Sequence, residues 1–250
     1  MKRLPLIIKN LDSLVGNNQF VFLISHMRSY SSLLSHIMGS HRSISGYYET
    51  HLSYKNNLDL LHLEIKLMEE NNGKETIYLD KLLHNNCDIS DNIINSDRVK
   101  IIVYIRKPEK TCQSILHLAN KTQGMEPYQN IDYVANYYYS RLKFISDFSK
   151  RVSRDSLFFK AEDIIQDSEK ILSNISSFLG LSDRLDSNYK IFKRTRQPGA
   201  GDVSNYIRRG VVVKNEHKYN TKIDEQILKK LNVCYEDVYK SLKKNCKFIS

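Results

Sequence analysis

A short segment of the chain combines one permanent positive charge with several hydroxyl groups. Residues 25–32 read SHMRSYSS and directly follow the apolar run FVFLI. Arg28 supplies a guanidinium that stays charged in proteins, and serine hydroxyls donate hydrogen bonds to oxyanions. The bend is therefore suited to a phosphate, and we expect one of its serines to cap the helix that follows. The hydroxyl donors are Ser29, Ser31 and Ser32.

A second segment, further along the chain, carries a similar set of groups. Residues 99–115 read VKIIVYIRKPEKTCQSI, in which an apolar run leads to Arg106, then Pro108, then Ser114 eight residues after the arginine. Proline cannot donate to a strand ladder and commonly marks the exit from a strand. An arginine at a strand end and a serine near the start of the next helix can converge on one phosphate.

These groups need rigid elements to position them, and strand-like and helix-like segments alternate along the chain. Apolar runs predict strands at residues 20–24, 75–81, 99–105 and 156–160. Periodic apolar spacing predicts helices at residues 31–38, 57–74, 110–120, 131–152 and 167–180. Within the fourth of these, we expect Tyr133 and Tyr137 to pack against the sheet with their hydroxyls outward.

Strands separated by helices predict parallel βαβ units. We therefore predict an α/β fold: a single domain over residues 1–250 with a central, mostly parallel β-sheet and helices on both faces. In such open sheets, ligands bind beyond the carboxyl ends of the strands. The loop after the first strand occupies that position.

Composition restricts the class of protein. The chain has 250 residues, 16 of them Tyr and 9 Phe, which favours a globular fold. A net charge of +10 raises the local concentration of anions. The four cysteines show no spacing typical of a zinc site or a disulfide framework. The apolar stretch in the opening segment MKRLPLIIKN is too short for a signal peptide. We therefore expect a cytoplasmic protein without a membrane partner.

Five segments together resemble sulfotransferases that use 3′-phosphoadenosine 5′-phosphosulfate (PAPS). FLISHMRSYSSLLSHIM resembles their 5′-phosphosulfate loop, and VKIIVYIRKPEKTCQSI resembles their 3′-phosphate segment. TIYLDKLLHNN is similar to the strand and Asp-Lys turn of bacterial members, and LFFKAEDIIQDSEKILSNISSFLGL to the family's late strand, Glu-Asp turn and helix. RTRQPGAGDVSNY resembles the Gly-rich C-terminal segment. The resemblance covers residues 20 to 205.

This resemblance implies a P-loop-NTPase-like sulfotransferase fold, PAPS as co-substrate and 3′-phosphoadenosine 5′-phosphate (PAP) as product. The implied cofactor segments are residues 20–41, 99–116 and 194–205. The implied cofactor-binding residues are Arg28, Ser29, Tyr30, Ser31, Ser32, Arg106, Ser114, Arg196, Gly199 and Gly201.

Sulfuryl transfer needs positioned cations and a base. Charge develops on the leaving oxygen, and Arg28 and Lys81 are the candidates to stabilise it. Glu49, just past the first helix, and His84, three residues after Lys81, are alternative bases for the acceptor hydroxyl or amine. A sulfuryl group carries less charge than a terminal phosphoryl group, so no metal is expected.

The chain departs from the family at three places. Tyr30 stands where many members have Gly, and because Tyr is costly at positive φ we expect the backbone to take a different path there. The chain contains no Trp that could stack on adenine. Gln197 and Pro198 replace the usual Lys-Gly of the C-terminal segment.

Two other functions compete with this interpretation. One is a kinase-like transferase of nucleotides, although the nucleotide-triphosphate loop with Gly-Lys-Ser/Thr is absent. The other is a protein that binds RNA or another polyanion, which rests on the charge alone. We favour a bacterial-type enzyme of secondary metabolism, monomeric or homodimeric, with no nucleic-acid partner. Its acceptor, a small molecule or a glycan, would bind between residues 42–60, 115–135 and 200–220.

Overall fold

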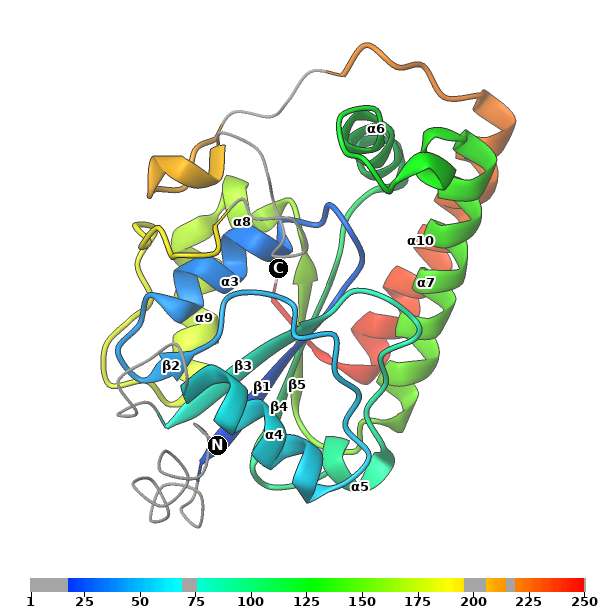
Figure 1. The fold of residues 1–250 in the computed structure, drawn as a ribbon. Helices are drawn as coiled ribbons and strands as arrows, with labels where there is room; N and C mark the ends of the chain where they lie inside the picture. The colour runs from blue at the N-terminus through cyan, green and yellow to red at the C-terminus, as the bar shows by residue number, and fades with distance from the viewer. Residues whose placement is uncertain (1–17, 69–75, 196–205, 215–218, 250) are drawn as a thin grey trace.

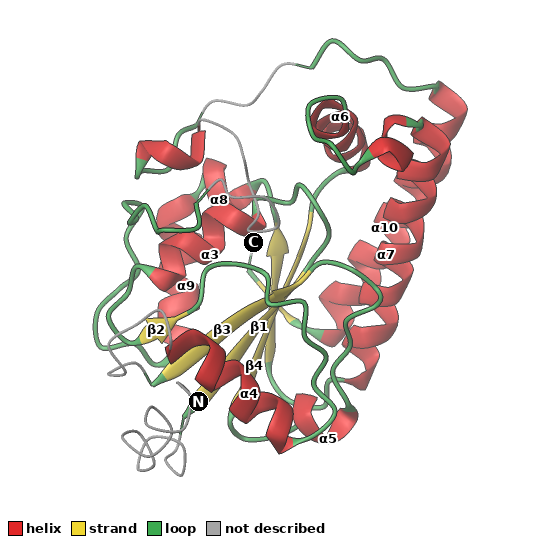
Figure 2. Ribbon diagram, in the orientation of Figure 1, coloured by secondary structure: helices red, strands yellow, loops and turns green. Residues whose placement is uncertain are grey.

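The computed structural model describes residues 18–68, 76–195, 206–214 and 219–249. Within these residues the centre is a six-stranded sheet in the order β2-β3-β1-β4-β5-β6, and every pairing is parallel (Figures 1 and 2). The strands are β1 (Gln19–Ile24), β2 (Ile44–Ser45), β3 (Ile77–Leu82), β4 (Val99–Ile105), β5 (Ser156–Lys160) and β6 (Lys247–Phe248). The predicted parallel α/β architecture is confirmed.

The four central strands, β1, β3, β4 and β5, each contribute to two hydrophobic cores. In β1, Phe20, Phe22 and Ile24 pack on one face, whereas Val21 and Leu23 pack on the other. Successive strand residues point to opposite faces, so a strand covered on both sides is apolar throughout. This is why β1 is apolar from Phe20 to Ile24 and β4 from Ile101 to Ile105.

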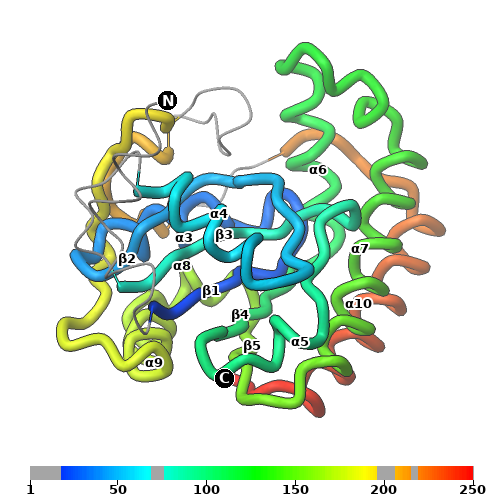
Figure 3. Tube along the Cα trace, turned by 60° about the horizontal axis from the view of Figure 1, so that its bottom comes forward, coloured from blue at the N-terminus to red at the C-terminus, as the bar shows by residue number. Residues whose placement is uncertain are grey.

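Helices cover both faces, as the two cores require. The first face, with Phe20 and Phe22, is covered by α4 (Asn57–Met68), α6 (Pro108–Ala119), α7 (Ile131–Arg151) and α10 (Glu225–Asn245). The second is covered by α3 (Ser31–Gly39), α8 (Asp163–Gln166) and α9 (Ser168–Leu179). Figure 3 shows α7 and α10 running side by side. Shorter helices are α5 (Asp91–Ile94), η1 (Glu126–Gln129) and η2 (Tyr206–Arg209).

The strand order brings the functional loops together. β1 lies between β3 and β4, and Ile24 at its end is level with Leu82 of β3 and Val103 of β4. Because the three strands are parallel, the loops that follow them leave the same edge of the sheet. This edge is the carboxyl end, where α/β proteins bind ligands.

The tyrosine prediction on α7 is wrong in its details. Tyr133 is 47% exposed, whereas Tyr138 is completely buried and donates a hydrogen bond to the Arg106 carbonyl. The buried face of α7 follows from helical spacing, since Val134, Tyr138 and Leu142 recur every four residues. Tyr137 is partly buried. Its hydroxyl accepts a hydrogen bond from the Met27 N–H, in the loop after β1, and donates one to the Leu83 carbonyl, in the loop after β3.

Candidate active site

The loop after β1 contains two residues other than glycine in the left-handed conformation. Arg28 has φ 62° and Tyr30 has φ 63°. Tyr30 thus adopts the conformation that was expected to be too costly for it. Such backbone geometry persists where surrounding contacts stabilise it. Here the Arg106 guanidinium stacks 4.3 Å from the centre of the Tyr30 ring, and Nη2 of Arg106 donates to the tyrosine hydroxyl at 2.7 Å.

The serines of this loop differ in where their hydroxyls lie. The N-cap of α3 is Tyr30 and has no side-chain capping bond, so the expected serine cap is not formed. Ser29 is buried and its hydroxyl donates to the His26 carbonyl at 2.7 Å, which directs it beneath the loop. Ser31 and Ser32 line the cleft described below. Nζ of Lys81 donates to the Ser32 hydroxyl at 3.2 Å.

His26 fixes the loop to the end of β4. Its Nε2 accepts from the backbone N–H of Arg106 at 3.0 Å, and its Nδ1 lies 2.9 Å from the Met27 carbonyl and donates to it. These partners require the neutral ring with its hydrogen on Nδ1. Complete burial lowers the pKa of His26 to about 3. The histidine therefore orients the loop from below.

The two phosphate segments predicted from the sequence meet in one cluster. Nε of Arg28 donates to the Ser114 hydroxyl at 2.9 Å, and Nη1 of Arg106 donates to the Arg28 carbonyl at 3.0 Å. The buried Nε of Arg106 has no hydrogen-bond partner in the described part of the chain. A buried donor without a partner costs free energy, so this guanidinium nitrogen would be stabilised by any acceptor that reached it.

A second cluster contains the candidate catalytic residues. Oε1 of Glu49 lies 3.8 Å from Nζ of Lys81, and Oε2 lies 3.8 Å from Nε2 of His84. Burial lowers the pKa of His84, while the nearby Glu49 carboxylate opposes the shift. The imidazole is therefore neutral at neutral pH and can accept a proton.

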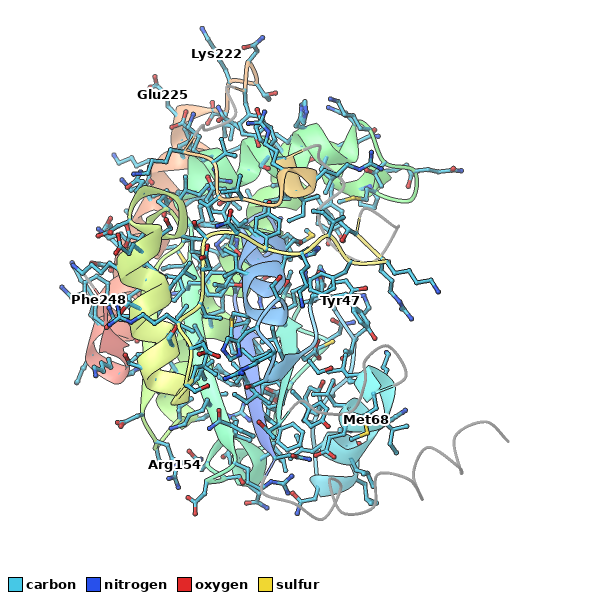
Figure 4. The ribbon with its side chains drawn as sticks, turned by 90° about the vertical axis from the view of Figure 1, so that its left-hand side faces the viewer. Tyr47, Met68, Arg154, Lys222, Glu225 and Phe248 are labelled. Atoms are coloured by element: carbon cyan, nitrogen blue, oxygen red, sulfur yellow. The ribbon has the colours of Figure 1, made fainter. Side chains whose placement is uncertain are left out.

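The segment that carries Glu49 is held from two sides. Tyr47, which Figure 4 shows beside α3, accepts a hydrogen bond from Ser35 through its carbonyl at 2.6 Å. On the other side, the Asp80 carboxylate accepts from the Thr50 N–H at 3.0 Å and from the Tyr54 hydroxyl at 2.6 Å. Burial raises the pKa of Asp80, and these hydrogen bonds stabilise its charged form. Asp80 thus ties the segment that follows Glu49 to β3, and this role was not predicted.

A buried arginine lies beneath the loops. Arg141 of α7 is completely buried, and its Nε donates to the Ser25 carbonyl at 2.8 Å. Its other nitrogens donate to the Leu82 carbonyl and, at 3.1 Å, to Oδ1 of Asn85. These acceptors are uncharged oxygens at the ends of β1 and β3. Burial lowers the pKa of Arg141 to about 10, so the side chain stays charged at neutral pH.

The two clusters open into one cleft. Its empty space is ≈ 1120 Å³, including solvent at the mouth. Eight of the residues predicted for the site line it: Arg28, Tyr30, Ser31, Ser32, Glu49, His84, Arg106 and Ser114. Lys81 lies behind this lining, in contact with two of its members. The predicted Arg196, Gly199 and Gly201 lie outside the described residues.

Further lining residues come from segments that no motif indicated. They are mainly apolar or aromatic and include Leu118, Tyr189, Ile207, Val211, Val213 and Tyr219. Several belong to the ranges predicted for the acceptor. Among the described residues, no cluster of three metal-ligating side chains occurs, and no helix is long and apolar enough to cross a membrane. All four cysteines are free and buried.

Comparisons with known proteins support the fold. No protein-family model matches the chain, and no curated protein matches it. Among solved structures, it is similar to the sulfotransferase domain from the curacin biosynthetic pathway, with 17% identity, a TM-score of 0.50, and coverage of 90% of this chain and 98% of that one. A structure of retinol dehydratase in a complex with retinol and PAP shares 16% identity, with a TM-score of 0.42 and coverage of 90% and 80%. The first similarity shows that this chain has a sulfotransferase-type fold.

Proposed function

We propose that this chain is a PAPS-dependent sulfotransferase that transfers a sulfuryl group to a hydroxyl or amine of an acceptor. One observation carries the proposal: Arg28 of the first segment and Ser114 of the second are joined at 2.9 Å in a single cleft. The same cleft holds Glu49 and His84, with Lys81 behind them. Donors for two phosphates and a proton acceptor are thus next to each other on this fold.

The residues of the cleft fit a doubly phosphorylated nucleotide. Arg106, with its unpartnered Nε, and Ser114 would hold the 3′-phosphate. Arg28, Ser31 and Ser32 would hold the 5′-phosphosulfate. PAPS, when bound, supplies an activated sulfuryl group whose transfer builds negative charge on the leaving oxygen. Two arginines are suited to this ligand because the guanidinium matches phosphate geometry with paired donors.

Residues of this chain would assist the transfer in two ways. Lys81 and Arg28 place positive charge beside the oxygens on which negative charge develops, in a partly dry site where such charges act strongly. The Glu49 and His84 pair takes the proton from the acceptor. In our proposal Glu49 receives it, and a neutral His84 is the alternative within reach of the same acceptor.

The acceptor would be a small molecule or a glycan. The cleft lining that belongs to neither cluster is mainly apolar and aromatic, and it includes Leu118, Ile207 and Val211. Surfaces of this kind bury the apolar body of a ligand, while a few polar groups orient it. The hydroxyl or amine of the acceptor would then face Glu49.

Thermal unfolding with nucleotides tests the proposal. We expect PAP at one hundred times its Kd to raise the Tm by about 5 °C or more, and ATP or a heparin fragment to raise it much less. Labelled PAPS should then transfer its sulfuryl group to a component of a source-cell extract. A larger rise in Tm with ATP than with PAP would favour a kinase-like enzyme. Stabilisation by the polyanion above both nucleotides would favour a polyanion-binding protein.

A further inference from the structure

Ser114 is the meeting point of three separate segments. Its hydroxyl oxygen accepts a hydrogen bond from Nε of Arg28 at 2.9 Å and another from the hydroxyl of Tyr219 at 2.9 Å. Ser114 is only 2% exposed, yet it lines the cleft. Tyr219 lines it too and comes from the segment before α10, which lies outside the recognised motifs.

The two incoming bonds determine what the Ser114 hydroxyl can do next. A serine hydroxyl has two acceptor lone pairs and one hydrogen. When both lone pairs receive donors, its hydrogen is left to be donated. One donor is a charged guanidinium, and linked hydrogen bonds polarise one another, so the Ser114 O–H becomes a stronger donor to an anion.

Tyr219 is held in place by α6, the helix that carries Ser114. The ring of His117 meets the Tyr219 ring edge to face, with centroids 5.6 Å apart. Two residues after Tyr219, the Thr221 carbonyl accepts from Nε2 of Gln113 at 2.8 Å. In Figure 1 this stretch of chain leads into α10 above α6, and Figure 4 labels Lys222 and Glu225 at the same end of the molecule. Contacts with one helix thus set the position of the phenol relative to the serine.

We infer that Tyr219 is a positioning residue for the 3′-phosphate. Its hydroxyl occupies one acceptor site of Ser114 and thereby directs the serine hydrogen toward the phosphate oxygen. The inference rests on the proposed function, because it assumes that Arg106 and Ser114 bind the 3′-phosphate of the nucleotide. It adds the segment before α10 to the groups that recognise this phosphate.

The test compares nucleotides with and without the 3′-phosphate in the variant Tyr219→Phe. Phenylalanine keeps the ring against His117 and removes only the hydroxyl. We expect the Kd of PAP, measured by titration calorimetry, to rise about three- to tenfold, as for one lost hydrogen bond. The Kd of adenosine 5′-phosphate should stay the same. The exposed Tyr139→Phe on α7 is the matched control and should change neither value.

A double-mutant cycle tests whether Tyr219 acts through Ser114. We expect Ser114→Ala to weaken PAP binding and Tyr219→Phe to add nothing in the Ser114→Ala background. Fully additive effects would overturn the inference. So would an unchanged PAP affinity in Tyr219→Phe, or an equal loss for both nucleotides, since the latter indicates a general structural role.

The wild-type protein separates the two possible failures. If it binds PAP no more tightly than adenosine 5′-phosphate, the proposed function itself is wrong. If it prefers PAP and Tyr219→Phe keeps the full preference, the proposed function stands and the role of Tyr219 is refuted.

Discussion

Glu49 has a position that suits proton transfer. Its side chain is 11% exposed and lies between the Lys81 ammonium and the His84 imidazole at 3.8 Å from each. These distances are longer than direct hydrogen bonds, so the carboxylate oxygens can still accept a proton from an entering acceptor. Catalytic hydrogen bonds commonly tighten only when substrate is bound.

Glu49→Gln is the sharpest test at the residue scale. The amide has nearly the shape of the carboxylate but cannot take a proton, so we expect kcat to fall about 100-fold or more, as for loss of a general base. PAP affinity should change less than about twofold, because Glu49 is not among the phosphate donors. Transfer assays and calorimetry measure the two effects separately.

His84→Gln serves as the comparison for this test. If Glu49→Gln keeps kcat within a few-fold while His84→Gln loses it, the histidine is the base. If both variants retain turnover, neither residue is the general base.

A site can be predicted from sequence where side-chain chemistry is directly informative. Arg28, Arg106 and Ser114 were selected because cations and hydroxyls at strand ends are typical of anion sites, and the structure brings them together. Their binding of phosphate stays a prediction. Asp80 and Tyr219 could not be predicted, because their roles depend on contacts across the fold rather than on local spacing. Ser29 shows the converse, since its type suits phosphate but its hydroxyl is directed to a backbone carbonyl.

At the scale of elements, the approach of β2 to β3 depends on one glycine. Gly46 follows β2 with φ 113°, and a Cβ atom there would lie 2.1 Å from the Leu79 carbonyl oxygen. The next few residues carry the chain to Glu49. A side chain at position 46 would therefore push this segment away from the sheet.

Gly46→Ala should destabilise the protein strongly, whereas Gly180→Ala should not. Gly180 also has a positive φ, at 66°, but has open space around its Cβ position. We expect Gly180→Ala to cost about 1–2 kcal/mol for the left-handed conformation. Gly46→Ala should cost about 2–5 kcal/mol through that strain plus overpacking. Urea unfolding gives both values, and equal losses would show that the space around Gly46 is not limiting.

Most of the long elements could be predicted from their patterns, whereas the short elements and one long helix could not. β2 and β6 contain two residues each, too few to show alternation. The long helix α10 was missed although its buried positions are helically spaced: Leu231, Cys234, Tyr235, Val238 and Leu242. Lysine and acidic residues between the buried positions make the α10 sequence look polar throughout. Only its packing against α7 in the structure shows that one face of the helix belongs to the core.

At the scale of the whole molecule, charge and burial together determine how the fold responds to acid. The sequence carries a net charge of +10, and lower pH adds further positive charge. Self-repulsion then weakens the compact state. His26 adds a specific contribution because burial keeps its ring neutral.

Stability should fall as the pH falls from the ordinary histidine pKa of 6.5 toward the value of about 3 for folded His26. In this interval the unfolded chain binds a proton at His26 and the folded chain does not, so acid favours unfolding. Above pH 6.5 this contribution is fully present. We expect His26→Gln, which cannot titrate, to show a smaller slope of unfolding free energy against pH than the wild type.

The exposed His62→Gln on α4 is the control for this measurement. It should retain the wild-type slope. An unchanged slope in His26→Gln would show that carboxylates and general repulsion account for acid sensitivity on their own.

Arg141 has a practical consequence for anyone who studies this cleft by mutation. Its charge lies beneath the floor, bonded to oxygens that carry no charge, and it stays when surface groups are changed. A variant without both Arg28 and Arg106 would still offer a positive background potential to any small anion. Weak residual binding of chloride or sulfate in such a double variant would reflect Arg141 together with Lys81, so a non-binding control protein for ligand screens has to account for both buried charges.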